Sequence, residues 1–213
     1  MNNYPYLFAG LPELFPDFEK SSHNIDLLMS HIMENTNPKE VKYIDWLIFG
    51  LKGENLTSHF YREVFKTRNS YLNTYFRYDL DIRNIQTAYI SKLNGTDPSL
   101  YLIGEGDLVN SLKTSRAADF GASEFFEDAG KLLNVLANSN ILEREQNLDL
   151  IRWNKAIQIT LFNHFDIDWL LGFVTRLQLV RRWDTLDPKI GAELFKRLVD
   201  EVRETYKKEN KEE

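Results

Sequence analysis

Apolar residues recur every three or four positions through most of this chain, the spacing that places them on one face of an α-helix. No segment alternates cleanly between apolar and polar residues over the length of a strand, and no Asn-Gly pair lies between β-branched runs. The pattern therefore predicts an all-α fold built from many helices, and capping residues along the chain indicate where the helices begin and end.

The segment 78–95, near the middle of the chain, has the clearest helical pattern. Its apolar residues fall on one face, and Asn94-Gly95 can supply the left-handed residue at which a helix ends. We expect Asp79 or Asp81 to begin this helix, because a carboxylate there can accept the free backbone N–H groups of the first turn. A turn and a second helix follow, so we expect a helical hairpin at the centre of the chain.

Other helices are marked by prolines and capping residues. Asn37-Pro38, Asp97-Pro98 and Asp187-Pro188 place proline at a first helical position, where its missing N–H removes no helical hydrogen bond. Asp166 is expected to cap another helix, and Asn69-Ser70 leaves room for a break within 56–77. Further helices are expected at 22–35, with Ser21 or Ser22 as cap, at 107–115, at 123–138, and at 141–163, with Leu150, Trp153, Ile157 and Leu161 on its apolar stripe.

These elements are expected to form a single all-helical domain over 1–206. Polar residues interrupt the pattern near 138–149 and mark a soft boundary that would divide the domain into two lobes. The aromatic and proline-rich residues 1–20 are expected to pack on the body as ordered coil or a short helix. The charged segment 207–213 has no apolar anchor, and we expect it to form a disordered tail.

Composition and charge narrow the classes of function. The 213 residues are 43% hydrophobic and 27% charged, as in a globular protein, and the net charge of −6 argues against broad nucleic-acid binding, which requires Lys and Arg to neutralise phosphates. There is no cysteine for a disulfide, a thiolate metal site or a nucleophile. The N-terminus lacks a signal-peptide pattern, and no run approaches the roughly 20 apolar residues that span a bilayer. We therefore expect a cytoplasmic protein with no direct membrane span.

Catalytic and cofactor-binding patterns are scarce in the chain. Gly104-Glu105-Gly106 lacks the preceding strand and the third glycine of a dinucleotide-binding fingerprint, and no phosphate-binding Gly-Lys-Ser/Thr loop occurs. We therefore expect no cofactor and no enzymatic activity. One alternative stays open, because His164, Asp166 and Asp168 offer nitrogen and oxygen donors for a metal ion. Aspartates at such a turn also serve as helix caps.

One local basic cluster consists of Arg176, Arg181, Arg182 and Trp183. Its last three residues precede the predicted helix start at Asp187-Pro188, so its cations would lie at a helix C-terminus, where the helix dipole favours positive charge. The alternative is a surface that contacts a partner, because Arg and Trp are enriched at the energetic centres of interfaces. We take these four residues as the candidate partner-binding site.

Several short motifs follow one another in a recognisable order. They are 4–14, Asp81-Ile82-Arg83-Asn84-Ile85 with Lys92 and Gly95, Gly106-Asp107-Leu108, 169–183 and 187–191. Together they resemble the C subunit, also called subunit d, of V/A-type rotary ATPases. The resemblance is closest to a short, DUF2764-like group that is encoded with bacterial V-type ATPase genes.

The resemblance implies a reduced version of a funnel-like helical protein, since members of the family have three similar lobes and this chain is too short for all three. It implies a non-catalytic central-stalk (rotor) subunit, a socket that couples the stalk to the membrane proteolipid ring for ion transport. Its partners would be the stalk subunits and that ring, and its location would be cytoplasmic, peripheral to the inner face of the membrane through the complex. The alternative is a soluble helical adaptor or regulator of another protein.

Overall fold

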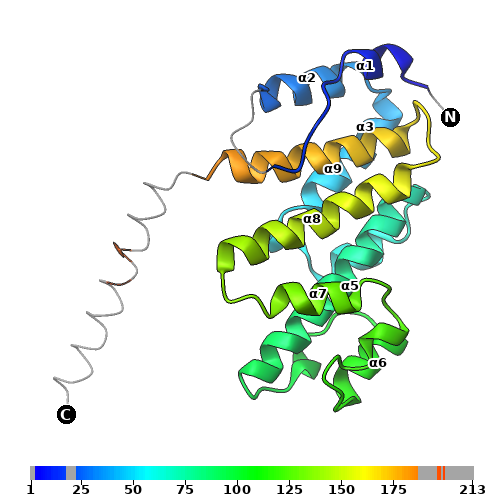
Figure 1. Cartoon of the computed structure of the whole chain (residues 1–213). Helices are drawn as coiled ribbons and strands as arrows, with labels where there is room; N and C mark the ends of the chain where they lie inside the picture. The colour runs from blue at the N-terminus through cyan, green and yellow to red at the C-terminus, as the bar shows by residue number, and fades with distance from the viewer. Residues whose placement is uncertain (1–2, 18–22, 187–195, 198, 200–213) are drawn as a thin grey trace, which may run out of the picture.

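The computed structural model of the chain describes residues 3–17, 23–186, 196, 197 and 199, and its secondary structure there is helical throughout (Figure 1). The predicted all-α fold is thus confirmed. The α-helices are α1 (Pro5–Ala9), α2 (Ile25–Asn35), α3 (Pro38–Gly50), α4 (Ser58–Val64), α5 (Ser70–Leu93), α6 (Asp107–Thr114), α7 (Ala129–Leu136), α8 (Ile141–Thr160) and α9 (Ile167–Asp184). The 3₁₀ helices are η1 (Gly53–Asn55), η2 (Pro98–Leu100) and η3 (Ala122–Glu124). The predicted helix start at Asp187-Pro188 and the tail 207–213 lie outside the described residues.

Helix α9 is the central element of the fold. It packs against α8, α3, α5 and α2, and most of its side chains are buried, as expected of a helix that is apolar nearly all round. It begins as predicted, because the Asp166 side chain accepts the backbone N–H of Trp169 at 2.9 Å. In Figure 1, α8 and α9 run side by side, with α1 and α2 above them and α6 and α7 beside the lower part of α5.

The 24-residue helix α5 confirms two boundaries predicted from the sequence. The break at Asn69-Ser70 is present, and the Asn69 side chain caps α5 by accepting the backbone N–H of Leu72 at 2.8 Å. The helix also ends as predicted, with Asn94 as its C-cap and Gly95 in the left-handed region at φ +66°. A left-handed residue suits glycine because it has no Cβ to clash with the following carbonyl.

The predicted start of a helix at Asp79 or Asp81 is wrong, because α5 runs through both positions without interruption. Neither carboxylate has free backbone N–H groups to cap in the interior of a helix. Asp79 is buried between arginines, and Asp81 is half-buried. Asp79 is therefore a buried charge compensated by two arginines, and Asp81 is a half-buried carboxylate within the same helix.

Two other predicted boundaries also differ from the structure. Helix α2 begins later than predicted and is capped by Asn24, whose side chain accepts a backbone N–H of the first turn. The expected caps, Ser21 and Ser22, lie outside the described residues. The helix predicted at 123–138 is shorter, because η3 and a turn precede α7, whose first residue is Ala129. The left-handed Gly121 ahead of η3 redirects the chain there.

The buried face of α8 differs from the predicted stripe of Leu150, Trp153, Ile157 and Leu161. Trp153 is buried, but Ile157 and Leu161 are 40% and 60% exposed. Small groups face α9 instead: a Cβ added to Gly172 would lie 2.6 Å from Thr160 Cγ2 and 3.3 Å from the carbonyl oxygen of Ala156. The two helices therefore approach more closely than a stripe of large side chains would allow.

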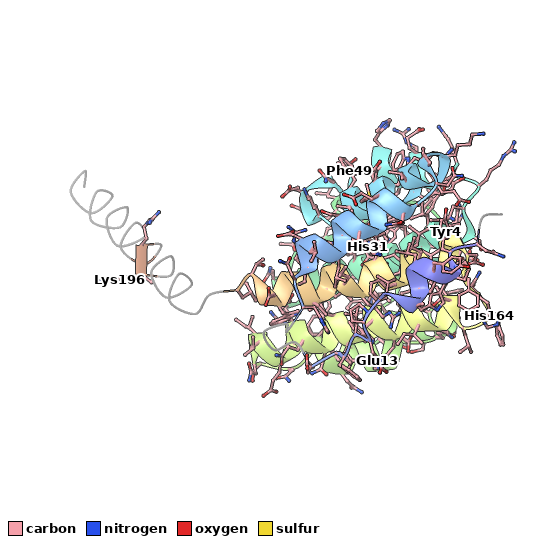
Figure 2. All side chains as sticks on the ribbon, turned by 90° about the horizontal axis from the view of Figure 1, so that it is seen from above. Tyr4, Glu13, His31, Phe49, His164 and Lys196 are labelled. Atoms are coloured by element: carbon pink, nitrogen blue, oxygen red, sulfur yellow. The ribbon has the colours of Figure 1, made fainter. Side chains whose placement is uncertain are left out.

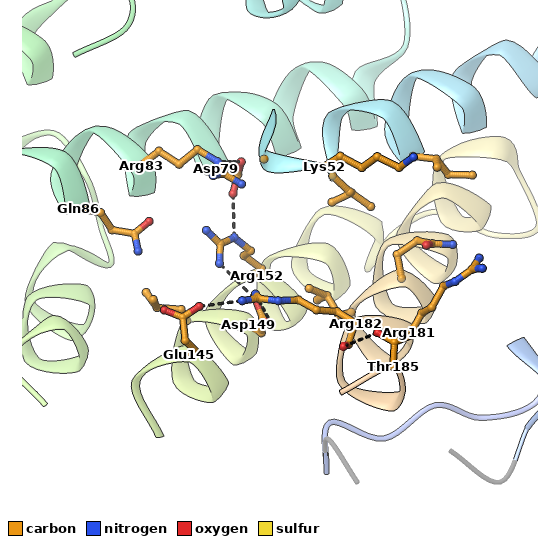
Figure 3. A pocket seen from close by; sticks show the side chains of 16 residues that line it. Lys52, Asp79, Arg83, Gln86, Glu145, Asp149, Arg152, Arg181, Arg182 and Thr185 are labelled. Carbon is orange, nitrogen blue, oxygen red and sulfur yellow. Dashed lines mark hydrogen bonds and ion pairs between the residues drawn. The ribbon is translucent and has the colours of Figure 1, made fainter. Parts of the chain in front are cut away.

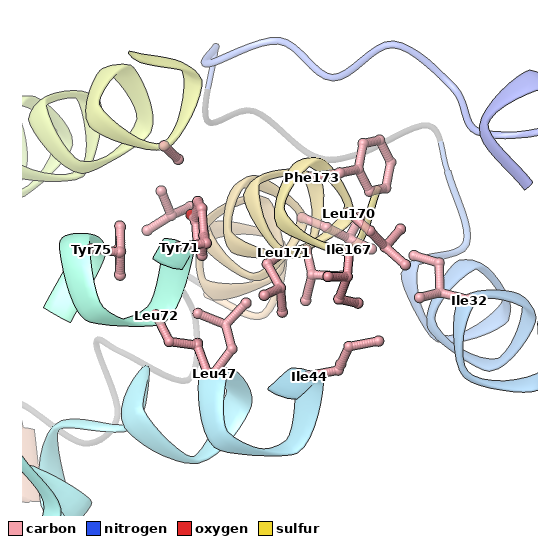
Figure 4. Close-up of a cluster of buried hydrophobic side chains, with 14 of the residues drawn as sticks. Ile32, Ile44, Leu47, Tyr71, Leu72, Tyr75, Ile167, Leu170, Leu171 and Phe173 are labelled. Carbon is pink, nitrogen blue, oxygen red and sulfur yellow. The ribbon is translucent and has the colours of Figure 1, made fainter. Parts of the chain in front are cut away.

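Buried apolar side chains form two clusters that share α5 and α8. The larger cluster combines the N-terminal part of the chain with α9, and Figure 4 shows Ile32, Ile44 and Leu47 facing Leu170 and Leu171. The smaller cluster is drawn from residues 78–151. The proposed soft boundary near 138–149 falls within that span, and the division into domains stays a prediction.

The turn between α8 and α9 holds the N-terminal segment in place. The Tyr4 backbone N–H donates to the carbonyl oxygen of Phe165 at 2.7 Å, and the Phe8 ring meets the Phe165 ring edge to face with centroids 5.3 Å apart. Figure 2 shows Tyr4 and His164 at the same end of the molecule. Residues 3–17 thus pack on the body, as the sequence predicts. In the described part of the chain, no helix has the length and apolar character needed to cross a bilayer.

Candidate functional site

A charged cleft of about 790 Å³ opens between the end of α3 and the helices α5, α8 and α9 (Figure 3). Among the described residues that line it, cations outnumber carboxylates by five to three, although the whole chain has a net charge of −6. The cations are Lys52, Arg83, Arg152, Arg181 and Arg182, and the carboxylates are Asp79, Glu145 and Asp149. The cleft is therefore a locally positive site on an acidic protein.

Asp79 of α5 is bound by two arginines. Its Oδ2 accepts a hydrogen bond from Arg83 Nε, one helical turn later, at 2.6 Å, and its Oδ1 accepts from Arg152 Nε of α8 at 2.8 Å. Asp79 is 3% exposed and Arg152 is 8% exposed, so both charges are removed from water and depend on each other for compensation. The pair joins α5 to α8.

The electrostatics of the pair keep both groups ionised at neutral pH. Burial alone would raise the pKa of Asp79, but the Arg152 and Arg83 guanidiniums outweigh burial and hold that pKa below its ordinary value. Burial alone would lower the pKa of Arg152, but the Asp79 and Asp149 carboxylates outweigh it, so the pKa of Arg152 is raised. Neither residue is therefore available as a proton donor or acceptor near neutral pH.

Asp149 extends the network from α8 to α9, as Figure 3 shows. Its Oδ1 accepts from Arg152 Nη1 at 3.2 Å, and its Oδ2 accepts from Arg182 Nη1 at 2.8 Å and from Trp183 Nε1 at 2.9 Å. Arg182 Nη2 donates in turn to Glu145 Oε2 at 2.8 Å. The network thus fixes three helices to one another through side chains that come from distant parts of the sequence.

Three of the four predicted partner-binding residues lie at this cleft. Arg181 and Arg182 line it, and Trp183 reaches Asp149 from α9. Arg181 Nη2 also pairs with Asp26 of α2 at 2.8 Å. Both arginines are in the last turn of α9, so the interpretation as cations that favour a helix C-terminus is consistent with their position.

Arg176 lies apart from the other three predicted residues. Its guanidinium stacks over the rings of Trp153, Trp169 and Phe173 at 5.6, 6.0 and 5.8 Å from their centroids, and burial lowers its pKa. Arg176 precedes Arg181 by five residues, which is about 1.4 helical turns, so the two side chains point to different sides of α9. Arg176 and Arg181 are therefore close in the sequence but lie on different faces of α9.

Local sequence patterns do not identify the carboxylates of the cleft, or its arginines on α5 and α8, as parts of one site. Asp79 and Arg83 have the i,i+4 spacing of a helical ion pair, and Asp149 and Arg152 have the i,i+3 spacing, so each pair was visible by itself. The contact between the two pairs cannot be predicted from the sequence, because Asp79 and Arg152 are 73 positions apart and no local pattern relates them.

The residues considered as metal ligands have other roles in the structure. Asp166 caps α9, and Asp168 Oδ1 accepts a hydrogen bond from Asn69 Nδ2 at 2.5 Å. Across residues 3–17 and 23–186, no three His, Cys, Asp or Glu residues are grouped in a way that could hold a metal ion. The alternative metal site at His164, Asp166 and Asp168 therefore has no structural support.

Comparison with known proteins gives a family but no characterised relative. The model of the family described as "Protein of unknown function (DUF2764)" matches residues 50–206, well over half of the chain. This range includes every charged residue of the cleft. No curated protein and no solved structure matches the chain.

Proposed function

Because the chain belongs to the DUF2764 family, whose description names no activity, we propose a function from its geometry and from the motif resemblance described above. The protein is a non-catalytic coupling subunit that belongs to the central stalk (rotor) of a V/A-type ATPase, where it joins the stalk to the membrane proteolipid ring. In this proposal it lies on the cytoplasmic side of the membrane and is held there by its partners.

The observation on which the proposal rests is a pair of exposed apolar clusters at opposite ends of the molecule. A patch of large, solvent-exposed apolar side chains commonly indicates a protein–protein contact surface. The turn-end cluster consists of Leu161, Phe162 and Phe165, which all lie between α8 and α9 and are 49–87% exposed. The α5-end cluster consists of Ile90, Leu93, Leu100 and Tyr101, which are 53–81% exposed.

Helix α5 sets the distance between the two clusters. Its N-terminus is joined to the start of α9, beside the turn-end cluster, by the bond between Asn69 and Asp168. Its last turn carries Ile90 and Leu93. A helix of 24 residues is about 36 Å long, so the clusters are separated by most of the length of the molecule. That arrangement suits a part that contacts two partners at the same time.

The ion pairs of the cleft hold α5, α8 and α9 rigidly to one another. Arg152 and Asp149 connect α5, α8 and α9, and the small residues around Gly172 hold α8 and α9 in close contact. Breaking a buried ion pair costs about 3–5 kcal/mol, so sliding these helices past one another is unfavourable. A subunit that transmits torque by contact requires such resistance to shear.

Affinity purification from native membranes tests the proposal. We expect the tagged wild-type protein to recover V/A-type ATPase stalk subunits and the proteolipid. Phe162→Ser, in the turn-end cluster, and Leu93→Ser, in the α5-end cluster, should each weaken one set of partners and leave the other set bound. Leu27→Ser is the matched control, because Leu27 is 67% exposed on α2 and belongs to neither cluster.

The results separate the proposal from its alternative. Recovery of no ATPase subunit by the wild-type protein would overturn the assignment to a rotary ATPase. Consistent recovery of an unrelated protein, lost in one of the cluster variants, would support the adaptor alternative instead. If both cluster variants behave like the Leu27 variant, the exposed clusters are not contact surfaces.

A further inference from the structure

We propose that the charged cleft binds a small oligoanion, that is, a small molecule with two or more phosphate or carboxylate groups. This inference concerns the isolated protein and is independent of its place in an ATPase. It rests on the free hydrogen-bond donors of the cleft, on the neutralisation of its carboxylates, and on its size.

Several cationic hydrogen-bond donors in the cleft have no acceptor among the described residues. Asp79 engages only Nε of Arg83, and within the described residues no acceptor binds the two terminal nitrogens of Arg83 or Nζ of Lys52. The side-chain amides of Gln86 and Gln178 also line the cleft without a hydrogen-bond partner in that part of the chain. A guanidinium with two free N–H edges is suited to a phosphate or a carboxylate, which it can bind through parallel hydrogen bonds.

The carboxylates of the cleft do not oppose an anion strongly, because each is already compensated. Asp79 is held between two arginines, and Asp149 is held by two arginines and the indole N–H of Trp183. Glu145 accepts a hydrogen bond from Arg182, and Asp26 offsets Arg181, so the remaining positive charge is that of Lys52 and of the free guanidinium edges of Arg83. An anion entering there gains charge-assisted hydrogen bonds without displacing the internal pairs.

The size and the walls of the cleft favour a small molecule over a protein segment. Its volume of about 790 Å³ lies within the range of roughly 300–1,000 Å³ typical of small-molecule sites. Arg152 in its lining is only 8% exposed, so a compact group reaches it more readily than a folded segment does. Apolar side chains, including Ile48 and Leu148, supply contact for the uncharged part of a ligand.

Isothermal titration calorimetry on the purified full-length protein tests the proposal, with pyrophosphate, citrate and hexaglutamate as probes at matched ionic strength. We expect saturable 1:1 binding of pyrophosphate or citrate, and the stronger of the two identifies the anionic group. Lys52→Glu should weaken binding by about tenfold or more, since one charge-assisted contact is replaced by repulsion. Arg83→Lys, which can keep a charge beside Asp79 but removes the guanidinium edges, should also weaken binding.

Lys39→Glu is the matched control, because Lys39 lies in the first turn of α3 whereas Lys52 follows the other end of the same helix. It makes the same change of charge outside the cleft, and its affinity should stay within about twofold of the wild type, since exposed charges at a distance are screened. The absence of saturable binding by either small anion would overturn the proposal. Equal losses in the Lys39 and Lys52 variants, or tighter binding of hexaglutamate than of both small anions, would also overturn it. Circular dichroism of each variant confirms that the fold is retained.

Discussion

Arg152 Nε of α8 donates a 2.8 Å hydrogen bond to Asp79 Oδ1 of α5, and both side chains are almost completely buried. Their contact lies between the two hydrophobic clusters, since α5 and α8 contribute to both. The pair therefore links the two clusters, and substitutions at either residue should lower the stability of the whole fold.

Asp79→Asn should lower the free energy of unfolding by about 3–5 kcal/mol, because it leaves the buried Arg152 charge without its main counter-charge. Urea unfolding followed by circular dichroism measures the change. Asp26→Asn is the control, since it breaks the exposed pair with Arg181 and should cost less than about 1 kcal/mol. Similar losses in the two variants would show that burial of the Asp79 pair does not matter for stability.

Asp81→Asn should stabilise the protein in a pH-dependent way. Burial raises the pKa of Asp81 to about 6 from its ordinary 3.8, with Arg77 opposing the shift. The folded-state pKa lies above the unfolded value, so the wild type loses stability as the pH rises from about 4 to 6 and Asp81 ionises in an unfavourable site. The variant has no charge to bury. Its stability should match the wild type near pH 4 and exceed it by about 1–3 kcal/mol above pH 7.

Thermal unfolding of the wild type and the Asp81 variant between pH 4 and pH 8 measures this difference. A difference that is the same at every pH would contradict the prediction, because it would come from packing or helix propensity and not from ionisation. The buffers need equal ionic strength, since salt screens the nearby Arg77 charge.

Tyr71 and Tyr75 should respond differently to the same substitution, because only one of their hydroxyl groups has a hydrogen-bond partner among the described residues. Both are fully buried and their rings stack with centroids 5.6 Å apart, but only Tyr71 has a hydroxyl partner, Thr175 Oγ1 at 2.6 Å. The Tyr75 hydroxyl is buried without a hydrogen-bond partner in the described part of the chain. Tyr71→Phe should cost about 1 kcal/mol, and Tyr75→Phe should be neutral or stabilise by up to about 1 kcal/mol. Urea unfolding compares them, and a larger loss for Tyr75→Phe would reveal a partner for its hydroxyl.

Gly172→Ala should destabilise the fold by about 1–3 kcal/mol, because its Cβ would lie 2.6 Å from Thr160 Cγ2 and force α8 and α9 apart. The same substitution at Gly130, in α7, meets nothing within 4 Å and should instead stabilise by about 0.5–1 kcal/mol through helix propensity. Differential scanning calorimetry detects both shifts in melting temperature. Stabilisation by the Gly172 substitution would mean that the α8–α9 contact is looser than the structure indicates.

Local signals in the sequence were sufficient for most helix ends. Asn69 and Asp166 cap helices by contacts within three residues, so their roles follow from the neighbouring sequence alone. Asp79 has the same chemistry as a cap but lies in mid-helix, where a partner 73 residues away decides its role. A short-range pattern therefore identifies a capping residue only when no distant partner competes for it.

The candidate site was predictable in part for the same reason. Arg182 and Trp183 form a local cluster in the sequence, and in the structure both donate hydrogen bonds to Asp149. Their partner was not predictable, because it lies on another helix and because an aspartate on an amphipathic helix is usually solvated. Arg176 is close to them in the sequence, but the helical geometry of α9 places its guanidinium over the rings of Trp153 and Phe173.

The position of α9 at the centre of the larger cluster has a consequence for synthesis of the chain. Its partners α2 and α3 are complete once Gly50 has been synthesised, whereas α9 begins only at Ile167. At a synthesis rate of about 5–20 residues per second, the apolar faces of α2 and α3 stay exposed for on the order of ten seconds before α9 can cover them. The smaller cluster needs only residues 78–151, which are all made before α9. A nascent chain that ends before α9 can bury the smaller cluster while Ile32 and Ile44, in the larger cluster, remain exposed to chaperones or to aggregation. A truncation just before α9 leaves the protein in that state permanently.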